Sequence, residues 1–165
     1  MEAERERARR LLAKLPSGML LAAALLAGLP TLTPLALLNL GALPSSSLMH
    51  IFLAIYAVQL PLSLYTGHRI AVVLDELYDI CRRGREVPRP VLLAASAAPL
   101  GFIVPLSSLG TRLAACKLVQ AQKLGNNGLD LALNVMTLGL HAIIYASILE
   151  RILSSITEEA DEMPA

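Results

Sequence analysis

Five polar side chains recur at helical spacing within an otherwise apolar stretch near the carboxyl end of the chain. They are Asp130, Asn134, Thr137, His141 and Tyr145. At about 100° per residue, these positions fall within an arc of about 80° on one face of an α-helix. His141 lies well inside the stretch, and an ionisable side chain inside a membrane segment is a candidate for a proton or ion path. A neutral histidine that is hydrogen-bonded between helices is the alternative.

A second line of polar residues with helical spacing lies earlier in the chain, at Tyr56, Gln59, Ser63 and Thr66. If both segments cross a membrane in the same direction, Gln59 and His141 lie at similar depths. The two lines then predict a polar path or a small cavity lined by Tyr56, Gln59, Ser63, Asn134, Thr137, His141 and Tyr145. Hydrogen bonds that only hold the helices together are the alternative.

The segments that carry these lines are long and uncharged. No Asp, Glu, Lys or Arg occurs between Lys14 and Arg69, or between Arg89 and Arg112. A helix exposed to water needs a charged face, so these stretches predict membrane crossings of about 20 residues each. We expect four spans, at about 19–41, 48–66, 91–109 and 129–149. The predicted fold is an all-α integral membrane four-helix bundle, built from two transmembrane hairpins with short amphipathic surface helices.

The flanking segments are amphipathic or acidic. Residues 1–16 combine charges with apolar residues at helical spacing, and residues 68–83 do the same more regularly, so both predict surface helices. The acidic residues after 154 predict a disordered tail at 154–165. The membrane domain is therefore expected at 17–153.

Prolines inside the predicted spans mark positions where a helix could break, because each removes a backbone donor. The helix-break candidates are Pro30, Pro34, Pro61, Pro99 and Pro105. An ordinary kink is the alternative to a discontinuous helix of the kind that transporters use.

The distribution of Lys and Arg predicts the topology. The amino-terminal segment and the 69–89 loop carry five each, and the 112–123 loop carries three. The positive-inside rule then predicts that both termini and the 69–89 loop are cytoplasmic. Cys81 and Cys116 would lie on opposite sides of the membrane, so we expect no disulfide between them.

Several functions are excluded by missing features. The chain has no GxSxG, P-loop, HExxH or paired Cys/His signature, so we expect no enzyme, cofactor or metal. A net charge of +1 argues against a nucleic-acid partner. We expect a multi-pass membrane protein that carries or conducts a small solute or proton, with the lipid bilayer and either a second copy or another membrane protein as partners. A structural, membrane-shaping or assembly subunit without transport activity is the alternative.

Overall fold

The computed structural model is entirely helical in the part of the chain that it describes, residues 2–13, 15–16, 18–39, 45–81, 87–98, 100–118 and 127–161. The all-α prediction is therefore confirmed. The helices are α1 (Glu2–Leu12), α2 (Met19–Asn39), α3 (Ser45–Cys81), α4 (Arg89–Ala97), α5 (Ile103–Ala115), α6 (Asn127–Met136) and α7 (Leu140–Asp161).

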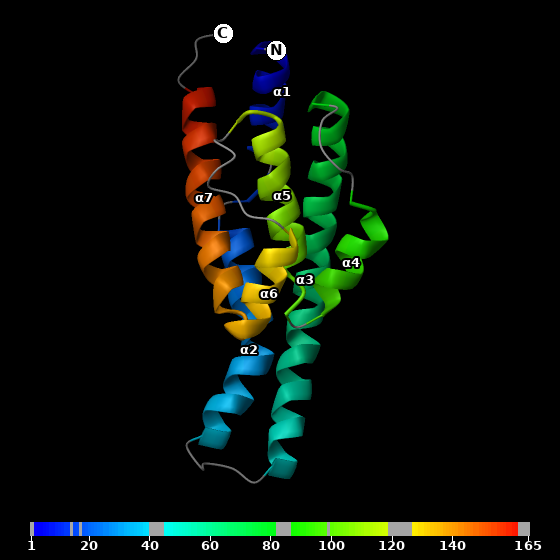
Figure 1. Cartoon of the computed structure of the whole chain (residues 1–165), viewed down its shortest axis with the longest axis vertical. Helices are drawn as coiled ribbons and strands as arrows, with labels where there is room; N and C mark the ends of the chain where they lie inside the picture. Colours follow the sequence, from blue (N-terminus) through cyan, green and yellow to red (C-terminus); the bar gives the residue numbers. More distant parts are fainter. Residues whose placement is uncertain are drawn as a thin grey trace.

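Helices α2 and α3 form a long hairpin that extends beyond the rest of the molecule (Figure 1). Both are long and apolar enough to cross a membrane, judged by length and composition. They continue through Pro30, Pro34 and Pro61, so these three predicted break positions end no helix. The predicted second span and residues 68–81 of the predicted surface helix form one continuous helix, α3.

The third and fourth predicted spans are both interrupted, so the four-span bundle is not confirmed. The third consists of α4 and α5, separated around residues 98–102, and the fourth consists of α6 and α7, separated at 137–139. Pro105 lies in the first turn of α5, where a helix tolerates proline. Pro99 lies outside the described residues.

The turn between α6 and α7 has the backbone geometry of a helix end. Leu138 has φ 53° and Gly139 has φ 96°, and Gly139 N–H donates to the carbonyl of Asn134 at 2.9 Å. Positive φ followed by this backward hydrogen bond is how many helices terminate. Gly139 suits the second position because it has no Cβ to oppose a positive φ.

The main hydrophobic core lies at the end of the molecule that carries both termini (Figure 1). There α1, α5, α7 and the carboxyl-terminal part of α3 bury their apolar faces, with Leu12, Ile70, Leu77, Leu109, Leu113 and Leu149 almost inaccessible. α1 and the later part of α3 are thus packed into the protein. Leu153 and Ile156 are also buried, which extends α7 to Asp161 through most of the tail that we expected to be disordered.

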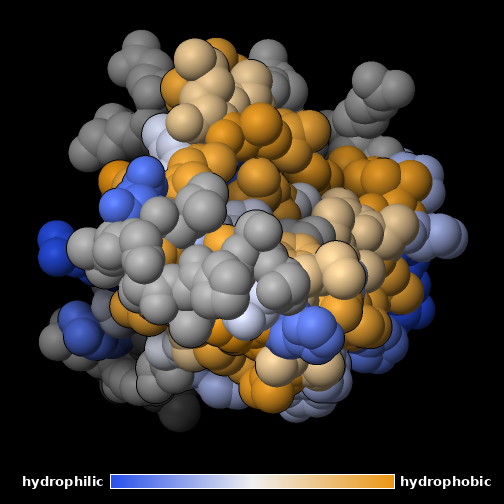
Figure 2. All heavy atoms as spheres, turned by 90° about the horizontal axis from the view of Figure 1, so that it is seen from below, coloured by the Kyte–Doolittle hydropathy of each residue, from blue (hydrophilic) through white to orange (hydrophobic). Residues whose placement is uncertain are grey.

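Much of the remaining surface is apolar. Seen from the end where α2 finishes and α3 begins, hydrophobic side chains cover most of the coloured surface, and hydrophilic ones lie mainly toward its edge (Figure 2). The exposed large hydrophobic residues include Leu35, Met49, Leu53, Val58, Met136, Leu140 and Ile144. This surface is suited to a membrane or to another apolar surface.

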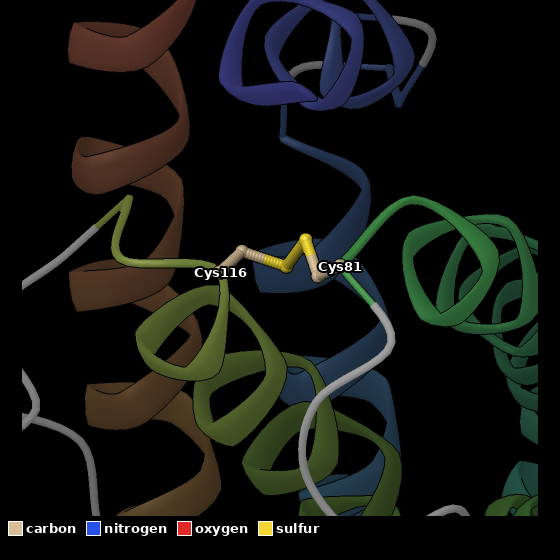
Figure 3. The surroundings of a disulfide bond; sticks show 2 residues. All are labelled: Cys81 and Cys116. Atoms are coloured by element: carbon tan, nitrogen blue, oxygen red, sulfur yellow. A yellow bond between two sulfur atoms is a disulfide. The ribbon is translucent and has the colours of Figure 1, made fainter. Parts of the chain in front are cut away.

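A disulfide joins Cys81, at the end of α3, to Cys116, which follows α5 (Figure 3). The Cα atoms are 5.5 Å apart, so the prediction that the two cysteines lie on opposite sides is wrong. The reason is the break after α4. Because α5 runs back toward the end from which α4 came (Figure 1), the chain returns to the side where α3 ended.

Candidate functional site

The candidate site lies where the break between α6 and α7 contacts the middle of α2. A Cβ added at Gly139 would lie 3.2 Å from the Cα of Gly28, so the two backbones are in close contact. The hydroxyl of Thr31 lies 3.4 Å from the carbonyl oxygen of Leu138 and bonds more closely to Gly28 O, at 2.9 Å. The break therefore lies about halfway along α2.

Asn134 connects this break to the one between α4 and α5. Its Nδ2 donates to the carbonyl of Leu100 at 2.7 Å, and its Oδ1 accepts from Ala142 N–H at 2.8 Å. The residue is 1% exposed. One buried amide thus satisfies a carbonyl in the first break and a free N–H at the start of α7.

Thr137 caps the start of α7 in the same way. Its hydroxyl oxygen accepts a hydrogen bond from His141 N–H at 3.0 Å. The hydroxyl group itself donates to the carbonyl of Leu133 at 2.8 Å. Side-chain oxygens at this position satisfy backbone donors that have no partner inside the helix. Two of the five residues in the predicted polar stripe therefore support the helix break.

Asp130 and His141 form the ionisable part of the site. One carboxylate oxygen of Asp130 accepts from the Ser107 hydroxyl at 2.5 Å, and the other lies 3.2 Å from His141 Nε2. Asp130 is 4% exposed, whereas the His141 side chain is 22% exposed. A buried carboxylate that pairs with a more accessible imidazole provides two neighbouring positions at which a proton can reside.

Three helices position this pair. Ser107 comes from α5, Asp130 from α6 and His141 from the first turn of α7. The Tyr145 ring lies one turn further along α7, 6.1 Å from the His141 ring between centroids, and is buried. The pair therefore depends on the break, because a straight helix would separate residues 130 and 141 by about 16 Å.

The predicted line on α3 makes a different set of contacts. Tyr56 donates its hydroxyl to the carbonyl of Ala97, the last residue of α4, at 2.6 Å. Gln59 Nε2 donates to Ser63 Oγ at 2.9 Å within α3. These hydrogen bonds do not join the α3 line to the 130–145 stripe. Helix α5 lies between the two lines and contacts α3, α6 and α7.

Two cavities among the described residues lie away from this site. One of about 280 Å³ adjoins α1, α2 and α7, and another of about 340 Å³ adjoins α1 and α3. Neither is lined by a residue of the predicted path. No group of three or more metal-binding side chains occurs among the described residues.

The sequence did not identify Ser107 as a site residue, and it did not predict the burial of Asp130. Ser107 is one of two adjacent serines in an apolar segment, which offered a signal, but its partner depends on how α5 packs. The sequence predicts that Asp130 lies at the edge of a straight span. Its burial follows from the short, separate helix α6.

No family model matches the chain, and neither a curated protein nor a solved structure does.

Proposed function

We propose that the protein is an integral membrane protein in which the α2–α3 hairpin crosses the bilayer and the Asp130–His141 pair transfers protons. The buried carboxylate–imidazole pair at the helix break carries this proposal. Ionisable groups within a membrane are costly and are found where protons or ions move.

The outward faces of two helices support the membrane placement. On α7 the exposed residues change from Leu140, Ile144 and Ile148 to Arg151, Ser154 and Ser155. On α3 they change from Met49, Leu53, Val58 and Tyr65 to His68, Asp75 and Glu76. Each change from apolar to polar marks a membrane boundary near one level of the molecule.

Glu150 relates this boundary to the start of α2. Its carboxylate accepts from the N–H groups of Gly18, Leu20 and Leu21 at 2.6, 2.9 and 3.2 Å. The change on α7 therefore coincides with the first residues of α2. From that level α2 extends about 30 Å, which matches the hydrocarbon thickness of a bilayer.

In this placement both helix breaks lie near the middle of the bilayer. Gly28, which contacts Gly139, is nine residues beyond Met19, or about 14 Å along the helix. The pairs α4–α5 and α6–α7 then enter to mid-depth and return to the same side. Non-helical backbone at such depth needs partners for its polar groups, and here the side chains of Asn134 and Thr137 bond to backbone groups on both sides of the α6–α7 break.

We also propose that both termini are cytoplasmic. The α2–α3 turn carries no Lys or Arg, because residues 15–68 lack both. The described Lys and Arg residues therefore lie on the other side of the proposed membrane, which the positive-inside rule assigns to the cytoplasm.

The test is proton flux into liposomes that contain the purified protein and an internal pH-sensitive dye. We expect flux with the parent protein, and a large loss in Asp130→Asn and His141→Gln, which preserve approximate shape but remove the titrating groups. His68→Gln is the matched control, because His68 is exposed on α3 at the boundary. Flux equal to that of protein-free liposomes, or unchanged in Asp130→Asn, would overturn proton transfer.

An assembly subunit without transport activity is the second candidate. The observation that favours it is the apolar outward face of α6, where Leu129, Val135 and Met136 are at least half exposed. A photo-crosslinking residue at position 136 would test it in native membranes. Capture of a second copy or of one defined membrane protein supports assembly, and capture of lipid alone argues against it.

A further inference from the structure

Helix α3 buries a continuous line of neutral polar side chains that the proton-transfer proposal does not use. Gln59, Ser63 and Thr66 are all 0% exposed. They are four and three residues apart, so they follow one face of the helix. The level of Thr66 is that of the proposed membrane boundary, and Gln59 lies about 10 Å further in.

Two polar atoms on this line have no hydrogen-bond partner among the described residues. They are the carbonyl oxygen Oε1 of Gln59 and the hydroxyl oxygen of Thr66. Gln59 Nε2 donates to Ser63 Oγ, and this is the hydrogen bond that joins two side chains of the line. Buried polar atoms without a partner are uncommon in native proteins, and ordered water is a frequent explanation.

The Ser96 hydroxyl of α4 is not the missing donor for Gln59 Oε1. A Cβ added at Gly67 would lie 2.0 Å from Ser96 Oγ, so Ser96 contacts the α3 backbone directly. Its hydroxyl is already donated to Leu92 O at 2.8 Å. The Tyr56 hydroxyl, at the other end of the line, is likewise donated to Ala97 O.

We propose that this line is a hydration site, in which water molecules bind the Gln59 carbonyl and the Thr66 hydroxyl. The ligand is neutral and small, because the side chains of the line are uncharged and offer one carbonyl acceptor and two hydroxyls. The proposal goes beyond proton transfer at Asp130 and His141 and does not depend on it.

Solid-state NMR in lipid bilayers tests this directly, by measuring how quickly magnetisation passes from water protons to side-chain amides. The probe is water itself, in protein labelled with ¹⁵N at glutamine and asparagine. The variants Gln59→Leu and Asn134→Ser each remove one side-chain amide signal, which assigns the signals of Gln59 and Asn134 in the spectrum. The Asn134 amide is the matched control, because it is equally buried and both its oxygen and its nitrogen are bonded to protein.

We expect faster transfer to the Gln59 amide than to the Asn134 amide, and slower transfer to Gln59 in Thr66→Val. Thr31→Val is the control substitution, because that hydroxyl already bonds to Gly28 O and lies on α2. Equal rates for the two amides in the parent protein would overturn the proposal, as would a Gln59 rate that Thr66→Val leaves unchanged. Neither result bears on flux through Asp130.

Discussion

The side chain of Asn134 donates from Nδ2 to the carbonyl of Leu100 at 2.7 Å, so one amide joins two separate interruptions in the helices. The same side chain accepts from Ala142 N–H at 2.8 Å. The α4–α5 and α6–α7 breaks are therefore one structural unit. Any role for the nearby Asp130–His141 pair depends on this unit, because it determines where α7 begins.

Asn134→Leu should destabilise the protein, because it keeps a similar volume but leaves the Leu100 carbonyl and the Ala142 N–H without their partner. Each orphaned buried group costs about 1–3 kcal/mol, so we expect a loss of about 2–5 kcal/mol in unfolding free energy. Reversible denaturation in detergent measures it. Ser155→Ala, on the exposed face of α7, is the control and should change stability by less than about 0.5 kcal/mol. A loss in Asn134→Leu no larger than in the control would contradict the role of the amide.

Glu150→Gln should loosen the start of α2. The carboxylate of Glu150 accepts three backbone N–H groups there, which compensates for donors that have no partner within the helix. Charge-assisted bonds and the helix dipole both favour the carboxylate over the amide, so we expect a cost of about 1–2 kcal/mol.

Hydrogen exchange of the first turn of α2 measures this effect locally. Exchange should accelerate at residues 20 and 21 in Glu150→Gln and stay unchanged in Glu158→Gln, which alters an exposed carboxylate on the same helix. Equal protection in the two variants would show that the carboxylate does not cap α2.

The Cys81–Cys116 disulfide should contribute to stability after isolation. It closes a loop between residues 35 apart in sequence, and bonds of this kind are worth about 2–4 kcal/mol. The double variant Cys81→Ser, Cys116→Ser should have an unfolding free energy lower by that amount. Reductant should lower the stability of the parent protein but not that of the variant. Identical unfolding curves for parent and double variant would contradict a formed bond.

The state of the same two cysteines in cells also reports on topology. The disulfide and the proposed orientation make opposite predictions for these cysteines, because a bond of this kind persists in oxidising compartments, whereas a cytoplasmic location keeps thiols reduced in most organisms. Alkylation in intact cells with a membrane-permeable reagent, before lysis, should then modify both cysteines. Protection of both until reductant is added would place this end in an oxidising compartment and reverse the proposed orientation.

The sequence predicted the helical fold because apolar periodicity is a local property, but it misjudged where helices end. The sequence predicts a possible break at Pro61 and an end of the second span at about residue 66, whereas α3 continues to Cys81. A proline inside a helix costs about 3 kcal/mol. The packing of Ile70, Leu74 and Leu77 in the core at the far end of α3 offsets that cost. The amphipathic pattern of residues 68–83 predicts their apolar face but not that this segment continues the second span.

The candidate site was predicted as a set of residues but not as an arrangement. Asn134, Thr137 and His141 were identified because they share a helical face. In the structure the helix is broken between Thr137 and His141, Asn134 and Thr137 cap the break, and the break brings His141 to Asp130. The decisive residue was Gly139, whose φ of 96° requires a turn that a straight-helix interpretation does not contain.

Gly67→Ala should displace α4 from α3. A Cβ at position 67 would lie 2.0 Å from Ser96 Oγ and 2.6 Å from Ser96 Cβ, which is too close for either atom to remain in place. Overpacking of this kind costs about 1–3 kcal/mol. Gly28→Ala is the matched control, because a Cβ there meets its neighbours at an ordinary 3.5 Å and alanine favours a helix over glycine by about 1 kcal/mol. Gly67→Ala should therefore lower the melting temperature, while Gly28→Ala leaves it unchanged or raises it. Ser96→Gly, which removes both clashing atoms, should restore much of the loss when combined with Gly67→Ala, and a double variant no more stable than Gly67→Ala would show that the two helices do not approach each other at this point.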